Sequence, residues 1–430
     1  MVFGWRFPAV LALGAAPVAL APAPLSVAVW TALVALAAGV DLALAVSPKA
    51  LRLERGPLAA IRLTETAVSV LTVANPTGRK ARLRLRDAWT ASAGAEREVR
   101  RLDVPAGEAR RTEGRLWPRR RGDLAADRVT VRSFGPFGLA GRQRSFEVPG
   151  RLRVLPEFRS RRHLPSRLAR LREMDGRAAA QVRGQGTEFD SLREYALGDD
   201  VRSIDWRASA RAEHVMVRTW RPERDRRVLI VLDTSRWAAG RVGDQTRLGA
   251  GIEAALLLGA LASAGGDRVE LVAVDRAVRA VAAPAVGSST MATLADRLAV
   301  VEPALVEANW KLIAGQINSR LRRRALVVLA TSTDPALVEV GLAPVLETLL
   351  RRHVVMVATV RDPSDAERLA GRGDLGEVFQ AAAAGRRGLA VTAVEKRLRS
   401  MGAQVVAALP ESLAPAVADS YLALKAAGRL

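Results

Sequence analysis

Acidic, basic and aromatic side chains alternate closely in one polar stretch, residues 184–237, which includes a short apolar run at 228–232. Carboxylates such as Glu194 and Asp205 could act there as a general acid or base. The stretch contains no histidine before His214, and no nucleophile is evident in it. Its chemistry therefore favours binding over catalysis.

Clustered opposite charges beside aromatic residues can form an interface for a partner protein or a fixed ion-pair network within one domain. We rank the interface first, the network second and a hydrolase that uses the signature carboxylates third. The residues concerned, called the signature below, are Glu188, Phe189, Arg193, Glu194, Tyr195, Gly198, Asp199, Asp200, Arg202, Asp205, Trp206, Ser209, Arg211, Glu223 and Arg224.

A second group of polar residues follows apolar runs further along the chain. Asp233 and Ser235 come after the run at 228–232, and Asp334 follows a run at 325–330. Carboxylate and hydroxyl oxygens suit Mg²⁺ or another hard cation. The third position of an Asp-x-Ser-x-Ser loop is Trp237 here, which cannot ligate a metal. The site is thus degenerate, Mg²⁺ is not required, and capping or turn roles for these residues are the alternative.

Both groups belong to a region in which apolar runs alternate with helical patterns. Strands are predicted at 228–232, 268–274, 325–330, 353–359 and 404–408, with helices between them and at 411–426. Continuous apolar strands separated by helices indicate a parallel sheet covered on both faces. Ligands of such folds bind at the carboxyl ends of the strands, where Asp233 and Asp334 stand. We therefore predict an α/β domain over 227–430.

The preceding segment has a different pattern. Stretches such as 61–64 and 81–85 alternate apolar and polar residues, and turn sequences separate them, so a small β-sandwich is predicted over 51–150. Residues 151–226 form a basic linker and the signature. Within 151–183, ten arginines and three acids give a net charge of +7, and apolar residues at helical spacing predict an amphipathic helix. That helix would lie on the bilayer, contact a partner, or pack on the next domain.

The amino-terminal end is lipid-compatible, because Asp41 is the only ionisable residue between positions 8 and 46. Residues 25–46 would form a helix about 33 Å long, enough to cross a membrane. We predict a transmembrane hairpin over 1–50 that turns at 21–24, with a cleaved signal peptide as the alternative for the first segment. Basic residues at both outer ends place the rest of the chain in the cytoplasm, as a multi-pass protein of the inner membrane. Asp41 would pair with a neighbouring helix or lie near lipid headgroups.

Composition limits the remaining classes. The chain has no cysteine, so disulfides and thiolate metal sites are excluded. Its net charge of +22 is spread along the chain, and aromatic residues make up only 4% of it, so no nucleic-acid partner is expected. A module that binds anionic lipid or nucleic acid through 151–183 and 119–121 stays as an alternative.

The order of motifs in the signature closely resembles the bacterial domain-of-unknown-function 58 family. The matching motifs are Glu188-Phe189, Leu192-Arg193-Glu194-Tyr195, Gly198-Asp199-Asp200, Arg202, Ile204-Asp205-Trp206, Ser209-Ala210-Arg211 and Glu223-Arg224. The resemblance extends to the sandwich and the hairpin. It implies a membrane-anchored protein whose C-terminal domain is similar to a von Willebrand factor A domain, with a mostly parallel, Rossmann-like sheet. It also implies a partner, an AAA+ ATPase of the MoxR type.

Residues and resemblance together predict a membrane-anchored, non-enzymatic scaffold or adaptor. Its von Willebrand factor A-like domain would mediate protein–protein interaction in the cytoplasm. Trp237 departs from the metal-ion-dependent adhesion site that many such domains carry, which argues against metal-dependent ligand capture in this chain.

Overall fold

The computed structural model describes residues 1–20, 22–181, 188–197, 199–221, 226–287 and 289–430. The chain forms two compact units, Met1–Glu157 and Phe158–Leu430. The predicted hairpin and sandwich segments both fall in the first unit. The linker helix, the signature and the predicted α/β domain fall in the second.

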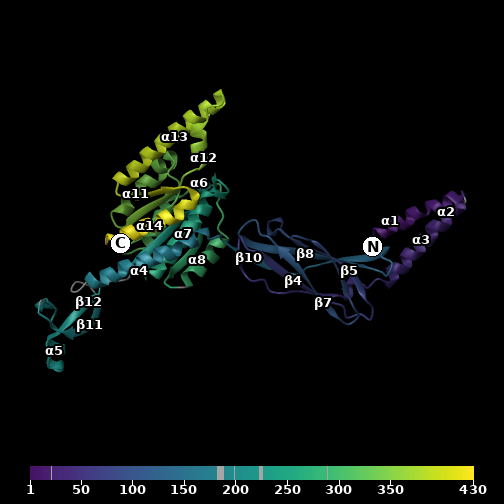
Figure 1. Cartoon of the computed structure of the whole chain (residues 1–430), viewed down its shortest axis with the longest axis horizontal. Helices are drawn as coiled ribbons and strands as arrows, with labels where there is room; N and C mark the ends of the chain where they lie inside the picture. The colour runs from purple at the N-terminus through teal and green to yellow at the C-terminus, as the bar shows by residue number, and fades with distance from the viewer. Residues whose placement is uncertain (21, 182–187, 198, 222–225, 288) are drawn as a thin grey trace. The chain divides into compact units, whose positions relative to one another are not determined.

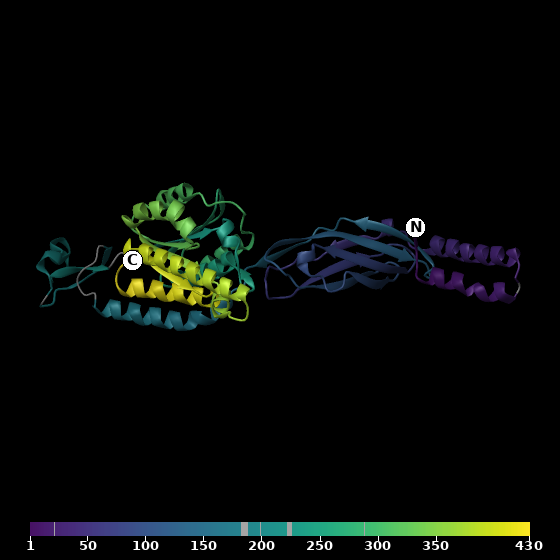
Figure 2. The same cartoon turned by 90° about the horizontal axis from the view of Figure 1, so that it is seen from above.

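The first unit begins with apolar helices that run side by side, α1 (Arg6–Leu13) and α2 (Ala15–Leu20) against α3 (Pro24–Leu44) (Figure 2). Gly14 permits this close approach, because a Cβ atom at that position would lie 2.1 Å from the Trp30 ring. The indole N–H of Trp30 donates to the Leu11 carbonyl at 3.3 Å. The 21 residues of α3 span about 31 Å, so this helix is long and apolar enough to cross a membrane.

Both outer ends of this hairpin join the β-structure that follows. Strand β1 (Val2–Phe3) pairs antiparallel with β9 (Ala140–Phe146). After α3 and a short 3₁₀ turn, β2 (Arg52–Arg55) pairs with β4 (Ala67–Ala74). The chain therefore enters and leaves the helical hairpin from the same side.

Two sheets make up the rest of the first unit. One has the order β2-β4-β7, and the other contains the path β1-β9-β8-β10-β3, with β5 paired to β8 and β6 paired to β5. Every second residue of β5 is buried, and Leu83 and Leu85 meet Leu71 and Val73 of the facing sheet. The predicted alternation thus forms the core between the sheets. The further strands are β3 (Ile61–Arg62), β5 (Ala81–Trp89), β6 (Val99–Val104), β7 (Ala109–Leu116), β8 (Gly122–Phe134) and β10 (Arg151–Leu155).

The second unit is built on a six-stranded sheet with the order β17-β16-β13-β18-β19-β20. All neighbours are parallel except the edge strand β17, which pairs antiparallel with β16. The strands are β13 (Arg227–Asp233), β16 (Arg268–Val274), β17 (Val278–Ala285), β18 (Leu326–Ala330), β19 (Val354–Val360) and β20 (Gln404–Ala408).

Helices cover both faces of this sheet, as Figures 1 and 2 show. Helices α9, α11 and α13 bury apolar side chains against one face. On the other face α7 packs against the sheet and α14. Most of α7 is buried, so its long apolar sequence is that of a core helix. The helices are α6 (Arg236–Ala239), α7 (Arg247–Ala264), α8 (Ser289–Ala299), α9 (Trp310–Arg320), α10 (Pro335–Leu337), α11 (Ala343–Leu350), α12 (Ser364–Ala370), α13 (Leu375–Ser400) and α14 (Pro410–Ala426), with a π-helical turn at Val338–Leu342 and a small hairpin of β14 (Arg241–Val242) and β15 (Gln245–Thr246).

The amphipathic helix predicted in the basic linker is α4 (Leu164–Gln181). It contacts α7 and α14. Leu171 is buried, and the Arg167 guanidinium pairs with Asp419 of α14 at 2.6 Å. Of the readings given above for this helix, packing on the next domain is the one that these contacts support.

Candidate functional site

The signature forms a hairpin with an inserted helix. Strand β11 (Glu188–Glu194) pairs antiparallel with β12 (Met216–Arg221), with an irregularity between Phe189 and Ser191. The connection between the strands contains a 3₁₀ turn at Val201–Ser203 and α5 (Trp206–Ala212) (Figure 1). A local β-hairpin therefore holds the polar residues in place.

Asp205 fixes the start of α5 and ties the helix to β12. Its carboxylate accepts hydrogen bonds from the backbone N–H groups of Arg207 and Ala208 at 3.1 and 3.0 Å. The same carboxylate accepts from Arg218 of β12 at 2.8 Å. The backbone bond from Ala208, followed by the bond from Arg218, lowers the pKa of Asp205. Asp205 is thus an N-cap and an ion-pair partner at once.

Ser209 strengthens the same connection. Its hydroxyl donates to the Asp205 carbonyl at 2.8 Å and accepts from the backbone N–H of Met216 at 2.8 Å. The helix ends at Glu213, whose φ of 60° lies in the left-handed region. Asp205 and Ser209 therefore stabilise the connection between α5 and β12.

Two neighbouring aspartates have similar structural roles. Asp199 pairs with Arg193 and accepts from the Ala196 backbone N–H at 2.9 Å. The hydrogen bond from Arg193 is the main reason that the pKa of Asp199 lies below its ordinary value. Asp200 caps the 3₁₀ turn by accepting from the Arg202 backbone N–H at 2.9 Å. All three aspartates of the signature thus accept hydrogen bonds from within the hairpin.

A different set of residues, some from the signature and some between its members in the connection from β11 to β12, lies at the surface. Trp206 is 70% exposed, and Leu197 is fully exposed. Val201 is exposed, and so are the side chains of three arginines on the turn and α5. We call this set the signature surface, and its members are Leu197, Val201, Arg202, Trp206, Arg207 and Arg211.

The structure places the other predicted residues as follows. Glu194 is exposed at the end of β11, and Tyr195 is 37% exposed beside it. Glu188 and Phe189 belong to β11, but their side chains lie outside the described part. Gly198, Glu223 and Arg224 lie outside the described residues altogether.

The carboxyl edge of the six-stranded sheet holds the second group of predicted residues. Asp233 ends β13 and is 4% exposed. One carboxylate oxygen accepts from the Ser235 backbone N–H at 2.8 Å, and the other accepts from the Thr331 hydroxyl at 2.7 Å. Burial raises the pKa of Asp233. Thr331 thus links the ends of the adjacent strands β13 and β18.

The remaining metal candidates make separate contacts. Asp334 caps α10 by accepting from the Ala336 backbone N–H at 3.1 Å. The buried hydroxyl oxygen of Ser235 and the indole nitrogen of Trp237 have no hydrogen-bond partner. Trp237 also packs against the core of the sheet.

A small cavity of about 20 Å³ lies at this edge, lined in part by Asp233, Trp237, Arg247 and Thr331. It has room for about one water molecule. Arg247, which borders the cavity, carries a positive charge. Its guanidinium donates to the Val360 carbonyl at 2.9 Å. Among the described residues, no group of three or more His, Cys, Asp or Glu is arranged to hold a metal ion. Mg²⁺ binding at this edge stays a prediction.

Asp41, the ionisable residue of the apolar segment, is fully buried at the end of α3. Its carboxylate accepts from the backbone N–H groups of Phe137, Leu139 and Ala140 at 2.8, 2.7 and 3.0 Å. It therefore binds the loop between β8 and β9, instead of the neighbouring helix or lipid headgroups expected from sequence. A Cβ atom at Gly135 would lie 2.1 Å from the Asp41 carbonyl oxygen, so the loop needs glycine there.

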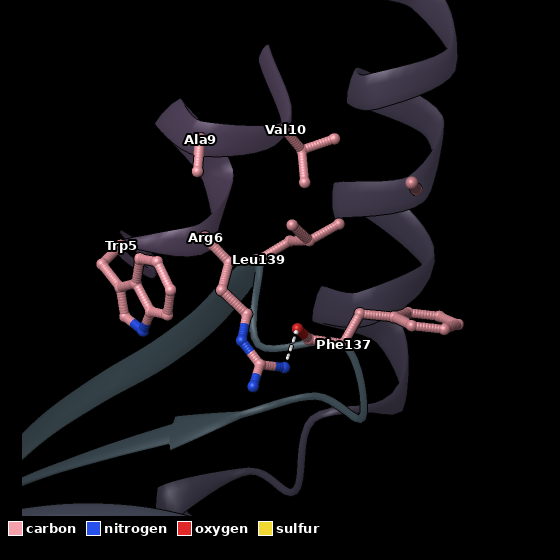
Figure 3. A pocket seen from close by; sticks show the side chains of 7 residues that line it. Trp5, Arg6, Ala9, Val10, Phe137 and Leu139 are labelled. Carbon is pink, nitrogen blue, oxygen red and sulfur yellow. Dashed lines mark hydrogen bonds between the residues drawn. The ribbon is translucent and has the colours of Figure 1, made fainter. Parts of the chain in front are cut away.

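The first helix reaches the same loop. Arg6 donates to the Phe137 carbonyl at 3.1 Å (Figure 3). The Gly4 backbone N–H donates to the Leu139 carbonyl at 2.8 Å. Side chains of α1, α3 and the loop line an apolar pocket of about 370 Å³ there. Both arms of the hairpin are thus attached to one loop of the sandwich.

Residues 191–403 match the family model described as "Protein of unknown function DUF58". This part of the chain belongs to the DUF58 family. The match begins within β11 and ends before β20, so it includes most of the signature and most of the α/β domain. It does not include the hairpin or the sandwich, to which the sequence resemblance also extended.

Two mycobacterial relatives share part of this sequence. Uncharacterised proteins of Mycobacterium tuberculosis and Mycobacterium bovis are each 27% identical over 188 residues. The matched stretch covers 43% of this chain, and the chain spans 58% of the length of these relatives. Their similarity says nothing of activity.

Two solved structures resemble one quarter of the chain. One is the PapD-like domain 7 of human CEP192, 15% identical with a TM-score of 0.17, and 92% of that chain is covered. The other is a protein of unknown function from Porphyromonas gingivalis, 16% identical with a TM-score of 0.20, and 49% of it is covered. Similarity at this level carries no functional argument.

Proposed function

We propose that this chain is a membrane-anchored, non-enzymatic adaptor that binds a partner protein through the signature surface of its DUF58 segment. The observation that carries the proposal is that two sets of side chains in this hairpin have different environments. Asp199, Asp200 and Asp205 accept hydrogen bonds from their own hairpin, while Trp206 and three arginines are exposed. Carboxylates with lowered pKa values are poor general acids or bases near neutral pH, which disfavours the hydrolase alternative.

The signature surface also has the composition of a protein-binding site. Trp and Arg are the residues most enriched among those that dominate binding energy. An exposed tryptophan beside Arg202 and Arg207 fits a partner with an apolar pocket bordered by carboxylates. The short-range hydrogen bonds that Asp205 and Ser209 make within the hairpin would keep this surface preorganised.

Membrane anchoring is proposed from α3 and its surroundings. Helix α3 is long enough to span a bilayer, and both ends of the hairpin return to the sandwich. Arg6 and Lys49 border the apolar segment, and the positive-inside rule then assigns the sandwich and the DUF58 segment to the cytoplasm.

We further propose a von Willebrand factor A-like fold for the α/β domain. In chain order its strands lie as 3-2-1-4-5-6, with only the third antiparallel. The position at which such domains bind a metal is bordered here by Trp237 and Arg247, so metal-dependent capture is not the proposed mode of binding.

The proposed partner is an AAA+ ATPase of the MoxR type, which the family resemblance implies. The test is a crosslinking pull-down from native membranes with wild-type chain and an Arg202→Glu, Arg207→Glu variant. Arg207 lies in the first turn of α5, where an acidic residue is tolerated, and Arg202 contributes its backbone N–H to the Asp200 cap. The hairpin should therefore still fold, which circular dichroism checks. We expect the wild type to capture the ATPase and the variant to lose it.

A variant with the same charge change elsewhere is the control. Arg386 and Arg387 are exposed on α13, away from the signature in sequence, and Arg386→Glu, Arg387→Glu should capture the ATPase as the wild type does. Equal loss in both variants would mean that net charge matters and the signature does not. Capture of no ATPase by any of the three proteins would contradict the partner assignment.

A further inference from the structure

The apolar pocket of the first unit lies where the helical hairpin meets the sandwich. Its volume of about 370 Å³ falls within the range of small-molecule sites. The loop between β8 and β9 forms one wall. The start of α1 and the inner part of α3 form the others, through Trp5, Arg6, Ala9, Val10 and Ala37.

The helical part of the pocket is apolar and lies along the hairpin. Ala9 and Val10 follow Arg6 by about one turn of α1, and Ala37 precedes Asp41 by about one turn of α3. Apolar side chains on the same helices are open to the surroundings, for example Leu36, which is 66% exposed. When α3 spans a bilayer, acyl chains cover such a surface. The pocket then opens to lipid, and an apolar chain is the occupant that suits it.

The other end of the pocket carries a positive charge. Arg6 is exposed, and its Nη1 donates to the Phe137 carbonyl at 3.1 Å (Figure 3). Within the described part of the chain no carboxylate pairs with Arg6. A guanidinium has several N–H donors, so the group can bind an anion and keep the bond to Phe137. Trp5 beside it is 65% exposed, and tryptophan is enriched at the boundary between membrane and water.

We propose that this pocket binds a glycerophospholipid with an anionic headgroup. Part of one acyl chain lies between Ala9 and Ala37, and the phosphate lies beside Arg6. A basic side chain at the membrane surface attracts anionic lipid, and the guanidinium fork matches phosphate oxygens. The inference rests on the proposed membrane anchoring. It uses no residue of the signature surface, so it is independent of the partner protein.

The experiment is native mass spectrometry of the full chain in detergent micelles. The two probes are dioleoyl phosphatidylglycerol and dioleoyl phosphatidylcholine, which have the same acyl chains. We expect the wild type to bind the anionic lipid about fivefold more tightly, as one basic side chain at a headgroup would give. Arg6→Gln keeps an N–H donor for the Phe137 carbonyl but should lose this preference. The control Lys49→Gln removes an exposed charge at the other border of the apolar segment and should keep it.

A second variant tests the apolar part of the pocket without changing charge. Ala9→Phe should fill the pocket and weaken binding of phosphatidylglycerol about fivefold or more, because the chain is excluded and the phosphate no longer reaches Arg6 in the same position. Ala32→Phe adds the same side chain to an exposed position of α3 outside the pocket lining and should bind like the wild type. Circular dichroism checks that both variants fold.

Three results would overturn the proposal. They are equal binding of the two lipids by the wild type, a preference that persists in Arg6→Gln, and unchanged binding of phosphatidylglycerol by Ala9→Phe. A dimer that Ala9→Phe abolishes would also overturn it, because a second copy of the chain would then occupy the pocket.

Co-flotation of the wild type with liposomes tests the anchoring separately. If the chain floats and shows no lipid preference, the lipid site is wrong and the anchoring stands. If the chain does not float, the anchoring and the lipid site are both wrong.

Discussion

At the scale of single residues, the signature shows how one sequence pattern can serve folding and binding together. Asp205 accepts from two backbone N–H groups and from Arg218, and the next residue, Trp206, is exposed. The sequence could show that acids, bases and aromatics cluster here. It could not show which carboxylates cap a turn, because that depends on which strand each loop returns to.

The lowered pKa values of Asp199 and Asp205 make a prediction about acid stability. A carboxyl group whose folded pKa is depressed stabilises the fold above its unfolded pKa of about 3.9, and that stabilisation is lost as pH falls through the folded value. We expect amide protection of residues 206–218 to stay constant from neutral pH to about pH 4 and to fall below it. Hydrogen exchange, expressed as protection factors, measures this.

The variant Asp205→Asn is the control for that experiment. Its amide keeps one acceptor oxygen for the cap but cannot pair with Arg218, so the segment should already be less protected at neutral pH and should lose less on acidification. Protection that declines between about pH 7 and pH 5 would contradict the assignment, because no carboxyl group with a lowered pKa titrates there.

At the scale of elements, the loop between β8 and β9 joins the helical hairpin to the sandwich. Asp41 of α3 accepts from three of its backbone N–H groups, and Arg6 at the start of α1 donates to its Phe137 carbonyl. A buried charge held in this way fixes an orientation as well as a contact. The sandwich and the apolar helices should therefore move as one body.

This joint predicts a graded loss of stability. Asp41→Ala leaves three buried N–H groups without an acceptor and should lower the free energy of unfolding of the first unit by about 3 kcal/mol or more. Asp41→Asn keeps one acceptor oxygen and should cost less. Thermal unfolding in detergent micelles, followed by near-UV circular dichroism, measures both, with Asp127→Ala as an exposed-carboxylate control. Equal stability of Asp41→Ala and the wild type would contradict the joint.

The same scale shows what sequence patterns predict and what they miss. The buried strands β13, β18 and β19 follow from their apolar runs. Helix α13 and strand β17 are among the elements of the second unit that were not anticipated. Helix α13 has few buried residues along its 26, and the edge strand β17 buries only Ala282, so neither has a clear apolar period. The partners of Asp41 lie almost one hundred residues away in sequence, which no local pattern indicates.

At the scale of the whole molecule, positive charge is concentrated in places that the total of +22 does not reveal. Arginines, among them Arg320 and Arg322, line a pocket of the second unit, and others lie exposed around Arg207 in the connection between β11 and β12. The basic helix α4, by contrast, buries Leu171 and pairs Arg167 with Asp419. The net charge alone therefore does not separate arginines that pair within the fold from arginines that are exposed to solvent.

The central claim is that the signature surface binds a partner, and the affinity of purified MoxR-type ATPase for the full chain in nanodiscs tests it most directly. Trp206→Ala should weaken binding about tenfold or more, as expected for an exposed aromatic anchor. Trp117→Ala, which removes a tryptophan that is 56% exposed in the sandwich, should leave the affinity unchanged. Equal affinity of Trp206→Ala and the wild type would contradict the claim.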